Sequence, residues 1–175
     1  MTIPVNQIDP ELVSVALTGF HRALIRLRAD VAAAPEGDDG LTALTSATEC
    51  LYWACAIEET ARKSDPTFTV HADSYGQALV HGARWARNQS THQLAFVVAK
   101  PSGAVTWRPA ADLPAPERES GRQRTSYDAH LAGTAVLQTF ERIAGFFASE
   151  QNRTGSLLNS AITELTDLRA LGGSE

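Results

Sequence analysis

The chain has 175 residues, 43% of them hydrophobic, so it is long and apolar enough to bury a core without disulfides or structural metals. Its 15 basic and 20 acidic residues give a formal charge of −5, which excludes a uniformly basic protein that coats nucleic acid. No apolar run approaches the roughly 18 residues of a membrane span and residues 1–7 carry no export signal, so we expect a cytoplasmic protein with no membrane partner.

Two long helices are predicted first. Asp9 and Pro10 have the residue types of an N-cap and a first helical position, and Pro35 should end the helix that follows. Its apolar residues recur at helical spacing, at Val13, Leu17, Phe20, Leu24, Leu27 and Val31. A second helix is predicted over residues 41–63, ended by Asp65-Pro66. Its inner side would carry Leu44, Ala47, Leu51, Ala54, either Ile57 or Glu58, and Ala61.

Cys50 and Cys55 lie five residues apart in the second predicted helix. This spacing is neither a zinc pattern nor a disulfide framework. We therefore expect two buried, unreactive thiols.

A third helix should begin at Ser74, which has the spacing of a capping box with Gln77. Its apolar side would carry Leu79, Ala83, Ala86, Ser90 and Leu94. Residues 96–99 and 104–107 resemble two short strands around a turn at 100–103. Residues 108–126 contain three prolines and are expected to form an exposed connection.

The last third of the chain predicts two more helices. One should span residues 127–150, and a final one should follow Thr154 with Leu157, Leu158, Ile162, Leu165 and Leu168 on one side. The predicted fold is all-α or mainly α: a single domain, 1–175, built as an antiparallel bundle of about five helices. A small hairpin and loop insertion, about 96–126, separates the third and fourth helices.

Charge is unevenly distributed along the chain. Residues 84–124 hold seven basic residues and three acidic ones, although the whole chain is acidic. A local basic region can attract a polyanion whatever the net charge of the protein. The alternative is an arginine-rich loop that is simply solvated.

The third predicted helix carries the chain's most informative motif. The sequence has no zinc-binding pattern, phosphate loop, dinucleotide fingerprint or nucleophile elbow, so no metal or cofactor is expected. The run Arg87-Asn88-Gln89-Ser90-Thr91-His92 resembles the motif of HEPN-domain ribonucleases, in which arginine, often followed by asparagine, precedes a histidine. Arg124 and His130 have a similar spacing but lack the asparagine.

The HEPN resemblance implies a compact helical bundle that cleaves RNA without metal and leaves a cyclic phosphate. It also implies a homodimer, whose active cleft forms where two motifs meet. Some toxin members carry a tyrosine two residues after the histidine, where this chain has Leu94. An acidic residue often accompanies the motif, and Glu49, Glu58 and Glu59 are the candidates.

The chemistry of the motif suits RNA cleavage. Histidine titrates near neutral pH, so His92 could take the proton of the 2′-hydroxyl. Arg87 could grip the phosphate through two donors while Asn88 orients the site. Residues 87 and 92 are about 140° apart on an ideal helix, so a loosening of the helix near residues 90–92 would bring them closer.

Further residues share a helical face with Asn88 and His92. These candidate substrate-binding residues are His81, Arg84 and Trp85. Arg84 could serve as a second cation, and Trp85 could either stack on a base or pack in the bundle. Lone histidines elsewhere in the chain are expected to be ordinary surface or partly buried residues.

Two functions from different classes remain open. The first is a metal-independent endoribonuclease of the toxin or phage-defence type, with RNA as substrate and an antitoxin or another protein as a possible partner. The alternative is a non-catalytic helical interaction protein, such as a dimeric partner or neutralising subunit, that docks through the same face. Sequence-specific DNA binding is weaker, because the chain has no helix-turn-helix with a basic recognition helix.

Overall fold

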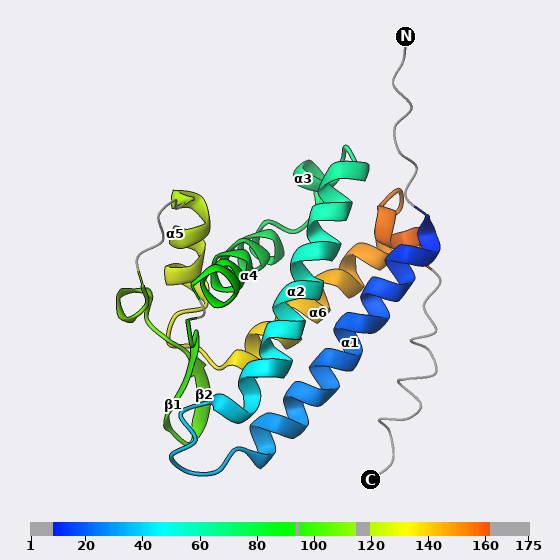
Figure 1. Ribbon diagram of the computed structural model, residues 1–175. Coiled ribbons are helices and arrows are strands. Elements are labelled where there is room, and N and C mark those ends of the chain that lie inside the picture. Colours follow the sequence, from blue (N-terminus) through cyan, green and yellow to red (C-terminus); the bar gives the residue numbers. More distant parts are fainter. Residues whose placement is uncertain (1–8, 94, 115–119, 162–175) are drawn as a thin grey trace.

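A computed structural model describes residues 9–93, 95–114 and 120–161 and is mainly helical (Figure 1). Its helices are α1 (Pro10–Ala33), α2 (Leu41–Ser64), α3 (Phe68–His71), α4 (Ser74–His92), α5 (Gly121–His130) and α6 (Val136–Asn152), with 3-10 segments η1 (Ala110–Asp112) and η2 (Leu157–Ser160). Strands β1 (Val98–Ser102) and β2 (Ala104–Trp107) form an antiparallel pair. The predicted mainly helical fold with a small hairpin insertion is confirmed.

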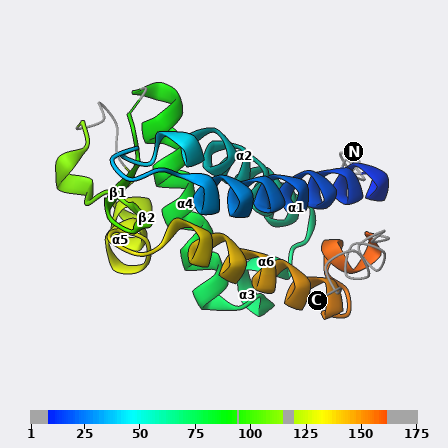
Figure 2. The same cartoon turned by 90° about the horizontal axis from the view of Figure 1, so that it is seen from below.

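Helices α1 and α2 form the long antiparallel pair seen in blue and cyan in Figure 1. The side chain of Asp9 accepts a hydrogen bond of 2.9 Å from the Glu11 amide, and Pro10 opens the helix, as predicted. In α2 both Ile57 and Glu58 are buried, so the inner side is wider than the sequence pattern indicates. Seen from below, α6 runs alongside α1 (Figure 2).

The start of α4 is predicted correctly, but its cap is not. Asp73, not Ser74, is the N-cap, and its carboxylate accepts a 2.6 Å hydrogen bond from the Gly76 amide. The side chain of Gln77 donates to the Ala72 carbonyl at 2.9 Å, so it takes no part in a capping box with Ser74. An aspartate one residue earlier is the better acceptor for the free amides of the first turn.

The hairpin lies slightly later than the sequence predicts. β1 begins at Val98 and runs to Ser102, so the turn is centred on Gly103, whose φ of 67° suits glycine. The inward side chains Val97, Val105 and Trp107 are buried, whereas Phe96, predicted to lie in the first strand, precedes it and is exposed. Burial alternates along β2, and Val98 of β1, which is also buried, pairs with Trp107, with an irregularity between Ala99 and Ser102.

Residues 121–126 do not form the exposed connection that the prolines predict. They begin α5, which packs along α4. At Gly82 of α4 the two helices are so close that a Cβ would lie 3.1 Å from the Tyr127 Cα, so α5 leaves no room for a larger side chain at this position. The predicted helix over residues 127–150 is likewise divided into α5 and α6. The break at 131–135 contains Gly133, with φ 73°, and pairs with β2 through Trp107 N to Thr134 O, 3.0 Å, and Gly133 N to Trp107 O, 2.9 Å.

Near the C-terminal end of the described chain, η2 follows α6, and Leu158 within it is fully buried. Ile162, Leu165 and Leu168 of the predicted final helix, like Leu94 of the third, lie outside the described residues. None of the helices that the structure describes combines the length and apolar character needed to cross a bilayer.

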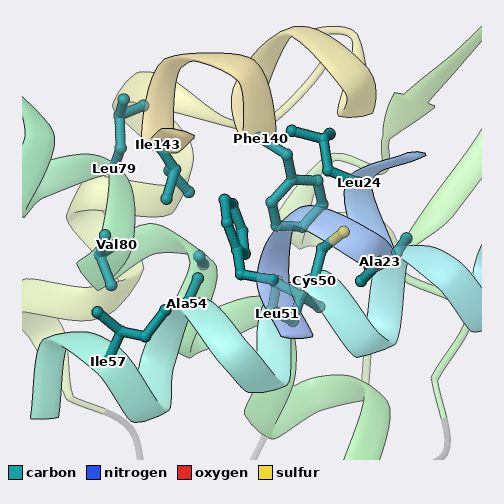
Figure 3. Close-up of a cluster of buried hydrophobic side chains, with 14 of the residues drawn as sticks. Ala23, Leu24, Cys50, Leu51, Ala54, Ile57, Leu79, Val80, Phe140 and Ile143 are labelled. Atoms are coloured by element: carbon teal, nitrogen blue, oxygen red, sulfur yellow. The ribbon is translucent and has the colours of Figure 1, made fainter. Parts of the chain in front are cut away.

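Buried side chains from α1, α2, α4 and α6 meet in the core around Leu24, Leu51, Leu79 and Phe140 (Figure 3). Cys50 and Cys55 belong to this interior, which confirms that both are buried. Burial raises the pKa of the Cys50 thiol to about 12 and that of Cys55 to about 11. Both are therefore thiols, the unreactive form, at neutral pH.

Lys100 links the hairpin to the end of α1. Its side chain is only 6% exposed, and Nζ donates to the carbonyls of Ala34 at 2.6 Å and Pro35 at 3.1 Å. We expect Lys100→Met to lower the free energy of unfolding by about 1–3 kcal/mol, because both carbonyls lose a charged donor at a helix C-terminus. Urea denaturation measures the change. Lys63→Met is the control, because Lys63 forms an exposed i,i+4 ion pair with Glu59. Equal losses in the two variants would contradict the assigned role of Lys100.

Candidate functional site

All six predicted site residues lie on α4, which packs between α2 and α5 (Figure 1). The helix does not loosen near residues 90–92 in a way that would bring Arg87 and His92 closer, because α4 continues to His92 and the Gln93 amide donates to the Gln89 carbonyl at 3.1 Å. The hydroxyl of Thr91 also donates to the Arg87 carbonyl, at 2.8 Å. Arg87 and His92 therefore point in different directions around a regular helix.

Arg84 faces α2. Its guanidinium forms an ion pair with the buried carboxylate of Glu58 and approaches Glu59 at 3.5 Å. Arg62 lies 3.5 Å from the other oxygen of Glu58. The positive charge of Arg84 is thus compensated inside the bundle, so it is poorly placed as a second cation for a substrate.

The three acidic candidates have different surroundings. Glu49 pairs with Arg26 of α1, at 2.7 Å, on the far side of α2 from the motif. Glu58 is 3% exposed at its side chain and pairs with Arg84 of the motif helix. Glu58 is therefore the acidic residue that the fold brings into contact with α4, with Glu59 beside it.

Arg87 and Asn88 are joined to each other and to α5. Arg87 Nη2 donates to Asn88 Oδ1 at 3.0 Å, and Asn88 Nδ2 lies 3.5 Å from Gln123 Oε1. Burial raises the pKa of the Cys55 thiol, and the positive charge of Arg87 partly opposes this rise. Arg87 is half-buried, with its guanidinium held by the amide of Asn88.

Trp85 is 2% exposed, and its ring centroid is 4.4 Å from that of Tyr127 on α5. The guanidinium of Arg124 lies 5.3 Å from the centre of the same indole ring. Trp85 therefore packs in the bundle, which was one of its two predicted roles. Stacking on a base would require it to leave this contact with α5.

His81 is half-buried on the first half of α4. Burial lowers its pKa, and the charges of Arg122, Arg84 and Arg62 act in the same direction against the opposing effect of Glu58. His81 is therefore neutral at pH 7, and it lies near cations from three helices.

His92 is exposed and is the last residue of α4. No hydrogen bond joins it to Arg87 in the described part of the chain. The second arginine and histidine at the motif spacing also separate: Arg124 pairs with Asp128 at 2.7 Å, and the ring of His130 packs against Tyr75. The structure thus joins the side chains of Arg87 and Asn88 by a hydrogen bond. His92, four residues after Asn88, is exposed at the surface.

Sequence reasoning missed Gln123, because residues 108–126 were expected to be an exposed connection; Arg122 was counted only as part of the basic region. Arg124 and Asp128, four residues apart and of opposite charge, are the local signal that a helix begins before Tyr127. Over the described ranges, no three His, Cys, Asp or Glu side chains gather closely enough to hold a metal ion.

Comparisons with protein families, with curated proteins and with solved structures found no match to this chain. The resemblance to HEPN domains therefore depends on the six residues of the motif and on the helical fold.

Proposed function

We propose that this protein is a metal-independent endoribonuclease that cleaves RNA through its own 2′-hydroxyl. The observation that carries the proposal is the hydrogen bond of Asn88 to the guanidinium of Arg87, one turn before an exposed histidine, His92, at the end of the same helix. An arginine fixed by one amide and a solvent-accessible imidazole are the two groups that the reaction needs.

In the proposed reaction His92 removes the proton of a 2′-hydroxyl. The 2′-oxygen attacks the adjacent phosphorus, the bond from phosphorus to the 5′-oxygen breaks, and that oxygen leaves with a proton from solvent. Arg87 stabilises the extra negative charge on the phosphate, and Asn88 holds the guanidinium of Arg87 in place. The products are a 2′,3′-cyclic phosphate and a 5′-hydroxyl.

Two parts of the proposal depend on the HEPN resemblance. One is a homodimer in which two copies of α4 approach each other, so that Arg87 of one copy can act with His92 of the other. The other is the biological setting, an intracellular toxin or phage-defence enzyme in the cytoplasm, controlled by an antitoxin or similar protein. A dimer would also overcome the angular separation of Arg87 and His92 on one regular helix.

The direct test is cleavage in a chelator. We expect wild-type protein in EDTA to cut a single-stranded RNA of mixed sequence, and a single 2′-deoxy nucleotide on the 5′ side of a cut site to abolish cutting there. The reason is that the deoxy sugar lacks the attacking oxygen. Cutting that appears only when Mg²⁺ is added, or that persists at the deoxy position, would rule out the proposed chemistry.

A non-catalytic interaction protein is the second candidate, and one observation favours it. Arg84 and Trp85, predicted to bind substrate, are occupied by contacts within the bundle, with Glu58 and Tyr127 respectively. A folded wild-type protein that binds a partner through α4 but cuts no RNA would support this alternative.

A further inference from the structure

Helices α4 and α5 together form a surface with a charge unlike that of the whole chain. α4 contains Arg84 and Arg87 and no acidic residue, and α5 contains Arg122 and Arg124 with Asp128 as its one acid. The two helices thus contain four arginines and one aspartate, in a chain of net charge −5, although Arg84 faces α2 and does not add to the charge of this surface. Two of the four, Arg84 and Arg124, are paired with Glu58 and Asp128.

Arg122 differs from these paired arginines. It is exposed in the first turn of α5, and no carboxylate among the described residues forms an ion pair with it. The guanidinium thus carries its full charge at the surface. Its charge is one of the causes that lower the pKa of His81 on α4, after burial.

The packing of α5 on α4 fixes where Arg122 lies. Gln123 is next to Asn88, and Tyr127 crosses Gly82 one turn further along α5. Arg122 therefore lies beside the motif, on the side of α4 that also carries His81. An uncompensated cation thus lies on the helix that contacts Asn88, the residue whose side chain holds the guanidinium of Arg87.

We propose that Arg122 binds a phosphate of the RNA strand other than the cleaved one, so that α4 and α5 together form the binding face for single-stranded RNA. The inference rests on the proposed function for the identity of the ligand. A strand lying along this face would meet Arg87 from α4 and Arg122 from α5, and Gln123 would connect the two helices beneath it.

The test measures binding separately from cleavage. The probe is a fluorescent single-stranded RNA with every 2′-hydroxyl methylated, which keeps the phosphates but removes the attacking group. We expect Arg122→Gln to weaken binding between about 3- and 10-fold and to reduce the slope of log affinity against log salt concentration by about 0.7. Arg122→Lys should recover most of the affinity. Circular dichroism confirms folding of each variant.

Arg22→Gln is the matched control, because Arg22 is an exposed arginine on α1 with no ion pair within the described ranges. It should change neither the affinity nor the slope. Equal effects of the two glutamine variants, or no RNA binding by the wild type, would overturn the inference.

Cleavage of unmethylated RNA separates this inference from the proposed function. If both hold, Arg122→Gln raises KM and leaves kcat unchanged. Binding that depends on Arg122 without any cleavage would support the RNA-binding face and contradict the nuclease. If the wild type cuts RNA and Arg122→Gln changes neither KM nor affinity, the nuclease is supported and the proposed RNA-binding face of α4 and α5 is overturned.

Discussion

Replacing His92 with alanine is expected to slow RNA cleavage by about 100- to 10,000-fold, the usual contribution of a general base. His92 is the only exposed imidazole of the motif, and alanine removes it at the end of α4 without disturbing a described hydrogen bond. The fold should therefore survive the change. Initial cleavage rates in EDTA, compared at equal protein concentration, measure the effect.

His71→Ala is the matched control for this variant. His71 is also an exposed histidine at the end of a helix, α3, but it lies outside the motif. Its replacement should leave the rate unchanged. A His92→Ala protein that is folded and cuts as fast as His71→Ala would remove His92 from the reaction.

The largest expected effect on stability comes from Arg153, which joins the end of α2 to the end of α6. Its guanidinium lies 2.7 Å from Asp65 Oδ2 and from Glu150 Oε2, and it donates to Thr67 Oγ1 at 2.9 Å. The two carboxylate side chains are only 4% and 3% exposed. We expect Arg153→Met to lower the free energy of unfolding by about 3–5 kcal/mol, because it leaves two buried charges without their cation.

Chemical denaturation at pH 7 measures this loss, with Arg28→Met as control. Arg28 pairs with Glu141 at 3.2 Å, but both side chains are about half exposed, so its removal should cost no more than about 1 kcal/mol. If the two variants were equally destabilised, the buried cluster would not have the role assigned to it.

The cost of Arg153→Met should also depend on pH. Burial raises the pKa of Asp65, but hydrogen bonds from Thr67 and Arg153 outweigh it and leave this pKa below its ordinary value. The wild type therefore gains stability from Asp65 above about pH 4, and it loses that gain as the pH falls through the lower native pKa. The difference between wild type and variant should narrow below about pH 4. A difference that stays constant would exclude Asp65 as the source of the pH dependence.

Most of the fold could be predicted because its signals are local. Asp9, Pro10 and Pro35 mark the ends of α1, and a regular apolar spacing marks its buried side. The start of α5 was not predicted, because its residues are mostly polar and its position depends on the close approach of α4 at Gly82. The break before α6 depends on pairing between residues 131–135 and β2, which is a contact distant in sequence. Periodicity cannot reveal either feature.

In the candidate site, too, the features set by local sequence could be predicted and those set by packing between helices could not. The sequence placed Arg87, Asn88 and His92 on one helix, because they lie in one uninterrupted helical pattern. It could not choose Glu58 from the acidic residues of α2, nor find Gln123, because both depend on how neighbouring helices pack against α4. Helix-to-helix contacts determined which of the predicted residues are free to meet a substrate.

The chemical nature of the RNA ends tests the central claim most directly. Wild-type protein is incubated with a defined single-stranded RNA in EDTA, and the fragments are identified by mass spectrometry. Attack by the 2′-hydroxyl predicts fragments that end in a 2′,3′-cyclic phosphate and partners that begin with a 5′-hydroxyl. Fragments with a 3′-hydroxyl and a 5′-phosphate, or intact RNA in the presence of folded protein, would contradict it.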